Sequence, residues 1–347
     1  MSVLRDTLER LLAKQDLAES EAADLLVALT DASMAPAMAG ALLAALRAKG
    51  VTANEVRGFA SAMRRLARRP QIGAVAAIDI VGTGGDASGS VNVSTGSALL
   101  VASLGAPVVK HGNRSVSSRS GSADLLECLG LPVPLDERAA AECLDATGFT
   151  FLFAPHYHPA MKEVAPVRRA LAVRTVFNLL GPLTNPAQPP FSLIGAYSAE
   201  AARLMADTLA GMPIERAFVV HGEPGWDEPT PIGPFELYDV RPGRVERQVR
   251  DPRDLGFARC APGDLAGGDA AHNAGCVRAV FAGEDRGAHR DALVLNAALA
   301  LEIMGRVARP ADGVAAAASA IDRGDATKLL DKVAAFGTRL NAARAGA

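Results

Sequence analysis

The segment Ala77-Ile-Asp-Ile-Val-Gly-Thr-Gly-Gly-Asp86 decides how this chain of 347 residues is interpreted. Its apolar start, Ala77 to Val81, predicts a buried β-strand, and the glycines after it predict a tight turn. Glycine lets backbone N–H groups approach a phosphate closely, although three glycines after a strand are as often an ordinary turn. The loop is not a Walker A loop, because no lysine follows at the required spacing, and it is not GxGxxG. We therefore treat it as a candidate phosphate site.

Beyond this segment, strand-like runs alternate with stretches of helical periodicity. The expected strands are 107–109, 150–153, 192–197, 217–221 and 277–282, and helical spacing is found in 97–104, 123–129 and 199–209. This alternation predicts an α/β fold with a mostly parallel central sheet that is covered on both faces. Ligands of such sheets bind at the carboxyl ends of the strands.

Upstream, the first 70 residues predict helices only. Pro36 stands where a helix can begin, Gly50 where it can end, and Thr52-Ala-Asn-Glu55 forms a capping box for the next helix. We expect a small all-helical domain at residues 1–70 and a larger α/β domain at 71–347, with helices near 156–180 packing on the small domain. The alanine-rich segment after Pro310 is also expected to be helical.

Net charge, hydropathy and cysteine spacing exclude several classes of binding partner. The net charge is −2, with 36 basic and 38 acidic residues and no block of like charges, which argues against a nucleic-acid or anionic-lipid surface. No stretch reaches the ~20 apolar residues that a membrane helix needs. Four scattered cysteines without a CxxC pair argue against a zinc site, and Cys128 is expected in the core. We expect a cytoplasmic protein with small-molecule partners.

Two further polar clusters lie beside expected helices. Asn92-Val-Ser94-Thr95 precedes one helix, where it could bind an anion or simply cap the helix. The second cluster begins at Lys110-His-Gly-Asn-Arg114 and continues through five serines, at positions 115, 117, 118, 120 and 122. A cation, several hydroxyls and an amide in one strand-to-helix connection suit a phosphorylated sugar.

Three other candidates each have an ordinary interpretation. Arg168 could be a surface arginine on a helix. The His156-Tyr-His158 pair has half the ligands of a metal site, but no third ligand is near in the sequence. Asp227-Glu228 lies among prolines and glycines, where acidic pairs are most often solvated turn residues.

The series GTGGD, NVST, KHGNRSVSSRSGSAD, FLFAPHYHPAMK, PVRRAL and RTVFNLLGPLTNP resembles the anthranilate phosphoribosyltransferases in order and spacing. The resemblance covers essentially the whole chain, including Gly267-Gly-Asp269, Asn273 and Asn296. It implies an enzyme of tryptophan biosynthesis, which transfers phosphoribosyl from phosphoribosyl pyrophosphate (PRPP) to the amine of anthranilate and releases pyrophosphate. It also implies two Mg²⁺ ions and a homodimer through the N-terminal helices.

The resemblance implies a role for each matched residue. Lys110, Asn113 and Arg168 would serve the reaction, and Ser94, Asp227 and Glu228 would hold magnesium. Anthranilate would contact Gly82, His111, Asn113, His158 and Arg168. PRPP would contact Gly82, Gly85, Asp86, Ser90, Asn92, Ser94, Thr95, Lys110, Gly112, Asn113, Ser117, Ser118 and Ser122. Ser90 stands where relatives carry threonine, and Trp226, Pro229 and Phe235 depart from the family pattern beside the acidic pair.

Such a reaction needs charge stabilisation and positioning more than a strong base. Magnesium and Lys110 would neutralise the departing pyrophosphate, while Asn113 and Arg168 would aim the amine. One alternative is a pyrimidine nucleoside phosphorylase-like enzyme, which would use free phosphate. Another is a non-catalytic nucleic-acid-binding relative, which should show a basic groove and broken motifs. A Rossmann dehydrogenase is disfavoured, because GxGxxG is missing and the N-terminus is helical.

Overall fold

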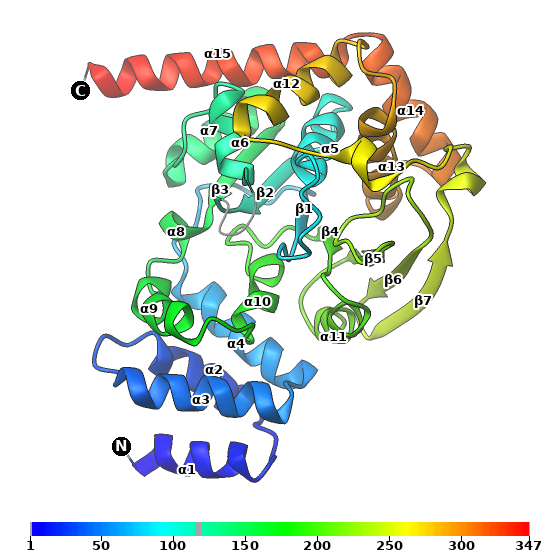
Figure 1. The fold of residues 1–347 in the computed structure, drawn as a ribbon. Coiled ribbons are helices and arrows are strands. Elements are labelled where there is room, and N and C mark those ends of the chain that lie inside the picture. The colour runs from blue at the N-terminus through cyan, green and yellow to red at the C-terminus, as the bar shows by residue number, and fades with distance from the viewer. Residues whose placement is uncertain (1, 115–118, 347) are drawn as a thin grey trace.

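The computed structural model describes residues 2–114 and 119–346. In these residues, a seven-stranded sheet forms the centre of the fold (Figure 1). Its spatial order is β3-β2-β1-β4-β5-β6-β7. The first five strands are parallel, whereas β6 and β7 run antiparallel at one edge. The strands are β1 Ile78–Gly82, β2 Val108–Gly112, β3 Phe149–Phe153, β4 Phe191–Gly195, β5 Arg216–Gly222, β6 Phe235–Arg241 and β7 Arg244–Arg250. The predicted α/β class with a mostly parallel sheet is confirmed.

Helices precede the sheet in the sequence and connect its strands. The first four are α1 Ser2–Leu12, α2 Glu19–Leu29, α3 Pro36–Lys49 and α4 Ala53–Leu66. The others are α5 Val93–Ser103, α6 Ser122–Cys128, α7 Glu137–Thr147, α8 Ala154–Tyr157, α9 Met161–Leu171, α10 Phe177–Leu180, α11 Ala199–Leu209, α12 Ala270–Phe281, α13 Ala288–Ile303, α14 Pro310–Asp322 and α15 Asp325–Ala345. In the described part of the chain, no helix combines the length and apolarity that crossing a membrane requires.

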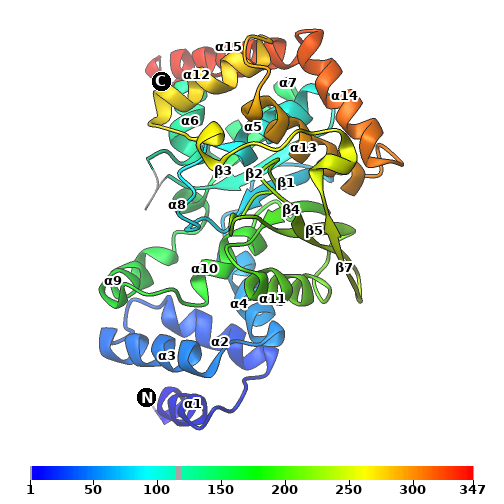
Figure 2. The ribbon, with the colours of Figure 1, turned by 45° about the vertical axis from the view of Figure 1, so that its right-hand side comes forward.

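The sheet separates two hydrophobic cores, because successive strand residues point to opposite faces. On β5, Phe218 and Val220 join the core that contains α5, α7, α13 and α15. The residues next to them, Ala217 and Val219, join the core that contains α11 and the N-terminal helices. Figure 2 shows these two layers above and below the sheet. Both faces of the sheet are therefore covered, as expected.

Local signals explain where the N-terminal helices begin and end. Thr52 accepts a hydrogen bond from the Glu55 N–H (3.3 Å), and the Glu55 carboxylate accepts one from the Thr52 N–H (2.8 Å). This confirms the capping box at the start of α4. Glu55 is fully buried and also binds Lys49, so it ties the end of α3 to α4.

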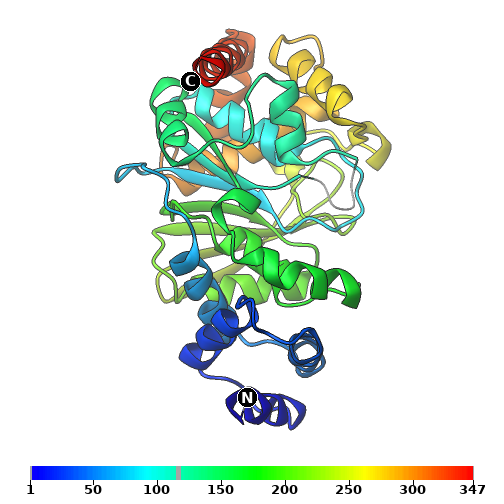
Figure 3. The same ribbon diagram turned by 90° about the vertical axis from the view of Figure 1, so that its left-hand side faces the viewer.

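The lower core joins the N-terminal helices to segments from the middle of the chain. Val164 of α9 and Phe177 of α10 belong to the same buried cluster as Leu42 of α3. Figure 3 shows α1–α4 below the sheet layer. The division of the chain at residue 70 stays a prediction.

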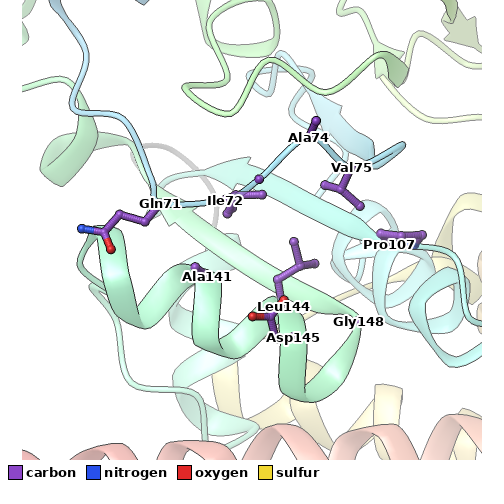
Figure 4. A pocket seen from close by; sticks show the side chains of 10 residues that line it. Gln71, Ile72, Ala74, Val75, Pro107, Ala141, Leu144, Asp145 and Gly148 are labelled. Atoms are coloured by element: carbon purple, nitrogen blue, oxygen red, sulfur yellow. The ribbon is translucent and has the colours of Figure 1, made fainter.

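The two ends of the parallel strands differ in chemistry. At the amino ends, Pro107 and Gly148 precede β2 and β3 and help to line a cavity of about 370 Å³ (Figure 4). Its lining contains none of the residues expected to act on substrates. At the carboxyl ends, Gly82 of β1 pairs with Gly195 of β4 and the polar loops begin.

Three expectations were wrong or incomplete. Residues 277–282, expected as a strand, lie in and just after α12, where Asn273, Val277 and Phe281 fall on the buried helix face. A short apolar run fits a buried helix as well as a strand. The antiparallel β6–β7 hairpin around Gly243 was not predicted. Cys128 is exposed, because Leu125 and Leu126 supply the buried face of α6.

The contact between α2 and α4 yields a stability prediction. A Cβ at Gly58 would lie 2.1 Å from the Glu19 carbonyl oxygen and 2.9 Å from the Ala22 Cβ. Gly58→Ala should therefore destabilise the fold by about 1–3 kcal/mol through overpacking. Gly275→Ala is the matched control, because nothing lies within 4 Å of a Cβ there, and alanine should stabilise α12 by roughly 0.5–1 kcal/mol. Urea unfolding checks both changes, and equal midpoints for the two variants would contradict this account.

Candidate active site

The residues Gly82–Asp86, which we call the phosphate loop, leave the carboxyl end of β1. Gly84 and Gly85 have φ angles of 66° and 74°, which only glycine adopts without strain. Both are exposed, so the loop backbone is open to a ligand. The Thr83 N–H donates to the Gly195 carbonyl oxygen (2.9 Å), which fixes the start of the loop on β4.

Asp227 and Glu228, called here the acidic pair, come from the connection after β5. The Gly84 N–H donates to Asp227 Oδ2 (2.6 Å), and the Asp227 N–H donates to Asp86 Oδ2 (3.3 Å). Glu228 Oε1 accepts the Ser94 N–H (3.0 Å) at the start of α5, and Ser90 Oγ lies 3.4 Å from Glu228 Oε2. Residues about 140 positions apart therefore meet at one point, and the acidic pair is not a solvated turn.

Burial sets the electrostatics of the acidic pair. It raises the pKa of both carboxyls. Repulsion from Asp86 raises both pKa values further, and repulsion from Asp227 also raises the pKa of Glu228. In the described residues, no three His, Cys, Asp or Glu side chains are arranged to hold a metal by themselves. Mg²⁺ commonly takes one or two carboxylates and completes its shell with water and substrate phosphates. The oxygen donors of the acidic pair fit that cation.

Lys110 on β2 is buried, 1% exposed, and its ammonium reaches β1 and the start of α5. Its ammonium donates to the Ile80 carbonyl oxygen and lies 3.4 Å from Ser94 Oγ. Burial lowers its pKa to about 8, against the attraction of Asp79, Glu228 and Asp227. The position makes Lys110 a counter-charge to the acidic pair, and its direct contact with a phosphate stays a prediction.

Asp79 is a buried residue that the sequence analysis missed. It accepts the His111 N–H (3.2 Å) and the Asn185 side-chain amide (2.9 Å), and burial raises its pKa to about 6 against the pull of Lys110. A carboxylate inside an otherwise apolar strand must have a buried partner. That signal was present in the sequence at Ile78-Asp-Ile-Val81.

An amide network joins the loop before α5 to α12. The Asn92 amide donates to the Ser120 carbonyl oxygen (3.1 Å), and Asn92 Oδ1 accepts the Asn273 amide (2.9 Å). Asn273 Oδ1 in turn accepts the Gly268 N–H (2.7 Å). Asn92 is thus held by the protein itself. Thr95 is fully buried, and its hydroxyl has no partner among the described residues.

His111 and His158 form a second, less charged part of the site. Their ring centroids lie 5.1 Å apart, and His111 Nδ1 is 3.1 Å from the Gly181 carbonyl oxygen. Burial is the main cause that lowers the pKa of His111 to about 3 and of His158 to about 4. Both rings are therefore neutral at pH 7, and they offer an aromatic wall rather than a metal site.

Arg168 on α9 is a half-buried cation. Its guanidinium stacks over Phe177 at 5.1 Å from the ring centroid, and burial lowers its pKa. No carboxylate pairs with it in residues 2–114 and 119–346. A half-buried guanidinium without a carboxylate partner suits an anionic group such as a ligand carboxylate, and the contact of Arg168 with a substrate stays a prediction.

The remaining predicted residues lie around the end of β2. A Cβ at Gly112 would be 3.4 Å from the Ser122 Cβ, so these two residues are adjacent. Asn113 is exposed, and its side-chain oxygen accepts the Arg114 N–H (2.7 Å). Ser117 and Ser118 lie outside the described residues.

Strand β2 divides the site. Lys110 points toward the acidic pair, whereas the next residue, His111, points toward Gly181 and His158, because neighbouring strand residues face opposite sides. A group of charged side chains and a pair of neutral aromatic rings therefore lie on the two sides of one strand end.

The raised pKa of Asp227 leads to a stability prediction. Without Mg²⁺, Asp227→Asn should raise the melting temperature at pH 8 by at least ~2 °C, because it removes a buried repulsive charge. The pKa is about 7 in the folded chain and lower in the unfolded chain, so wild-type stability falls as pH rises through this range. The gain should shrink as pH falls from about 7 toward 4.

Melting curves at several pH values, with and without Mg²⁺, test this expectation. Mg²⁺ should stabilise the wild type more than Asp227→Asn. If Asp227→Asn and the wild type have the same melting temperature at every pH, the ionised Asp227 carboxylate does not destabilise the fold.

The chain is similar to known proteins along nearly its whole length. Residues 5–67 match the glycosyl transferase family helical bundle domain, and residues 74–327 match the glycosyl transferase family a/b domain. The chain is 44% identical to the anthranilate phosphoribosyltransferase of Rubrobacter xylanophilus, covering 97% of this chain and 98% of that protein. It is also 44% identical to that of Desulforudis audaxviator, covering 97% of each.

Solved structures give the same result. The anthranilate phosphoribosyltransferase of Thermus thermophilus superposes with a TM-score of 0.89 at 40% identity, covering 96% of this chain and 99% of that one. The Saccharomyces cerevisiae enzyme in complex with PRPP and Mg superposes with a TM-score of 0.88 at 25% identity, covering 97% and 98%. The chain belongs to the anthranilate phosphoribosyltransferase family.

Proposed function

We propose that this enzyme transfers the phosphoribosyl group of PRPP to the amine of anthranilate, giving N-(5-phosphoribosyl)anthranilate and pyrophosphate in tryptophan biosynthesis. The observation that carries the proposal is the division of the site at β2. The phosphate loop and acidic pair suit a magnesium-bound pyrophosphate, while the neutral histidines and Arg168 suit an aromatic carboxylate. The yeast relative has been solved with PRPP and Mg and with 4-fluoroanthranilate.

Two Mg²⁺ ions would bind with PRPP, held by Ser94 Oγ, Asp227 and Glu228 together with phosphate oxygens. The ions would neutralise charge on pyrophosphate as it leaves. The N–H groups of Gly84 and Ser94 hold the carboxylates in place, and the positive charge of Lys110 partly balances their negative charge.

In the reaction, the bond from the anomeric carbon to pyrophosphate breaks and a bond to the anthranilate nitrogen forms. Arg168 would hold the carboxylate and Asn113 would lie between the substrates, so that the amine faces the anomeric carbon. The neutral, weakly basic His111 and His158 would lie beside the aromatic ring of anthranilate. Their low pKa values agree with a reaction that depends on positioning rather than on a strong base.

A pyrimidine nucleoside phosphorylase-like activity is the less favoured alternative. Arg168, which has no carboxylate partner among the described residues, suits a carboxylate that pyrimidine nucleosides lack.

We also propose a cytoplasmic homodimer through the N-terminal helices. The support for the dimer is apolar surface on that side of the molecule. Val3 and Val27 are 72% and 43% exposed, and a cavity of about 560 Å³ between α1, α2 and α3 is lined by Leu4, Met34 and Met38 among others.

The fluorescence of anthranilate tests the proposed activity. The signal should fall only when the enzyme, PRPP and Mg²⁺ are all present, with one pyrophosphate released for each anthranilate consumed. Free phosphate and a pyrimidine nucleoside serve as the control pair. Turnover of that pair, with no loss of anthranilate, would overturn the proposal in favour of the phosphorylase.

The same assay tests the role of Arg168. Arg168→Ala should raise the KM for anthranilate at least about tenfold and leave the KM for PRPP nearly unchanged, because a charge-assisted bond to the carboxylate contributes about 1.5–3 kcal/mol. Aniline, which lacks the carboxylate, is the control substrate. An equal loss with aniline and anthranilate would assign Arg168 to another role.

A further inference from the structure

Arg174 is a cation that contacts the phosphate loop but is not among the residues assigned above to PRPP or anthranilate. It lies between α9 and α10, on the segment that also carries Arg168 and Phe177. Its guanidinium donates to the Gly85 carbonyl oxygen and stacks on the Tyr197 ring, with 3.9 Å to the centroid. A guanidinium over an aromatic face is held by both charge and shape.

The contacts around Arg174 reach two other parts of the chain. Its carbonyl oxygen accepts a hydrogen bond from Arg47 of α3 (2.7 Å), which links it to the N-terminal helices. The Tyr197 N–H donates to Thr83 Oγ1 (3.1 Å), so the aromatic partner of Arg174 is itself bound to the phosphate loop. No carboxylate in the described ranges, 2–114 and 119–346, forms an ion pair with Arg174.

The phosphate loop needs an external restraint. Gly84 and Gly85 are exposed and lack side chains, so little in the loop itself fixes the orientation of their peptide groups. In a trans peptide, the carbonyl and the following N–H point in opposite directions. By holding the Gly85 carbonyl, Arg174 also fixes the direction of the Asp86 N–H and keeps a negative carbonyl dipole from turning toward a phosphate.

We propose that Arg174 is a positioning residue, which orients the phosphate loop for PRPP and connects it to the segment that carries Arg168 and Phe177. The proposal rests on the proposed function. Arg174 acts through the Gly85 carbonyl and not on the reacting atoms, so its loss affects PRPP binding before it affects chemistry. Arg47 on α3 supports Arg174 through its hydrogen bond, so Arg47→Ala should weaken PRPP binding less than Arg174→Ala does.

The experiment is calorimetric PRPP binding with Mg²⁺, together with steady-state kinetics, for the wild type, Arg174→Ala, Arg174→Lys and Arg47→Ala. Arg169→Ala is the matched control, an exposed arginine on the neighbouring helix α9. Arg174→Ala should weaken PRPP binding about tenfold and raise the KM for PRPP, with kcat within about threefold of wild type. Arg174→Lys should be intermediate, because an ammonium keeps the charge and loses the planar stack.

The outcomes separate the two proposals. A wild type that does not bind PRPP would overturn the proposed function. If the wild type binds PRPP and the Kd of Arg174→Ala for PRPP lies within twofold of the wild-type value, the positioning role is wrong. Should Arg174→Ala not fold, the same criterion applies to Arg174→Lys. An equal loss in Arg169→Ala would also overturn it, since the effect would then be one of general charge.

Discussion

Asp227 packs directly on the backbone of two neighbouring parallel strands, and the site depends on that contact. A Cβ at Gly82 would lie 2.3 Å from Asp227 Oδ2, and one at Gly195 would lie 1.4 Å from the Asp227 carbonyl oxygen. Only glycine at both strand ends lets the acidic pair approach the phosphate loop. The glycines are therefore required as much by the chain's own carboxylates as by a ligand.

This close approach has an electrostatic cost. The buried Asp227 and the partly buried Glu228 are repelled by Asp86, and the positive charge of Lys110 attracts Asp79 and the acidic pair. A bound divalent cation would relieve the repulsion and stabilise the arrangement that the phosphates need. On the other side of β2 the histidines are neutral, so the two substrate regions differ in charge although Lys110 and His111 are adjacent in sequence.

Much of this arrangement could be predicted from the sequence. The glycine loop and the two polar clusters stand out as candidate sites, because each combines unusual chemistry with a connection between a strand and a helix. The acidic pair is indicated only by the family resemblance, since its residues alone predict a solvated turn. The burial of Lys110 could not be predicted, because it depends on Asp79 and on the packing of α5 against β1. Arg174 was read only as part of a motif, since its partners Gly85 and Tyr197 are distant in sequence. The expected strand at 277–282 was wrong for a similar reason. A short apolar run fits a strand or a buried helix, and only the tertiary contacts of α12 distinguish the two.

We propose that the acidic pair holds magnesium for the departure of pyrophosphate. The most direct test is the reaction rate against free Mg²⁺ for the wild type and for Asp227→Asn combined with Glu228→Gln, with Glu223→Gln, an exposed carboxylate of the same connection, as the control. The amides keep the shape and remove the charge. We predict a kcat at least about 100-fold lower for the double variant, partly restored by high Mg²⁺, and a wild-type curve for the control. Superimposable curves for the double variant and the wild type would contradict the claim.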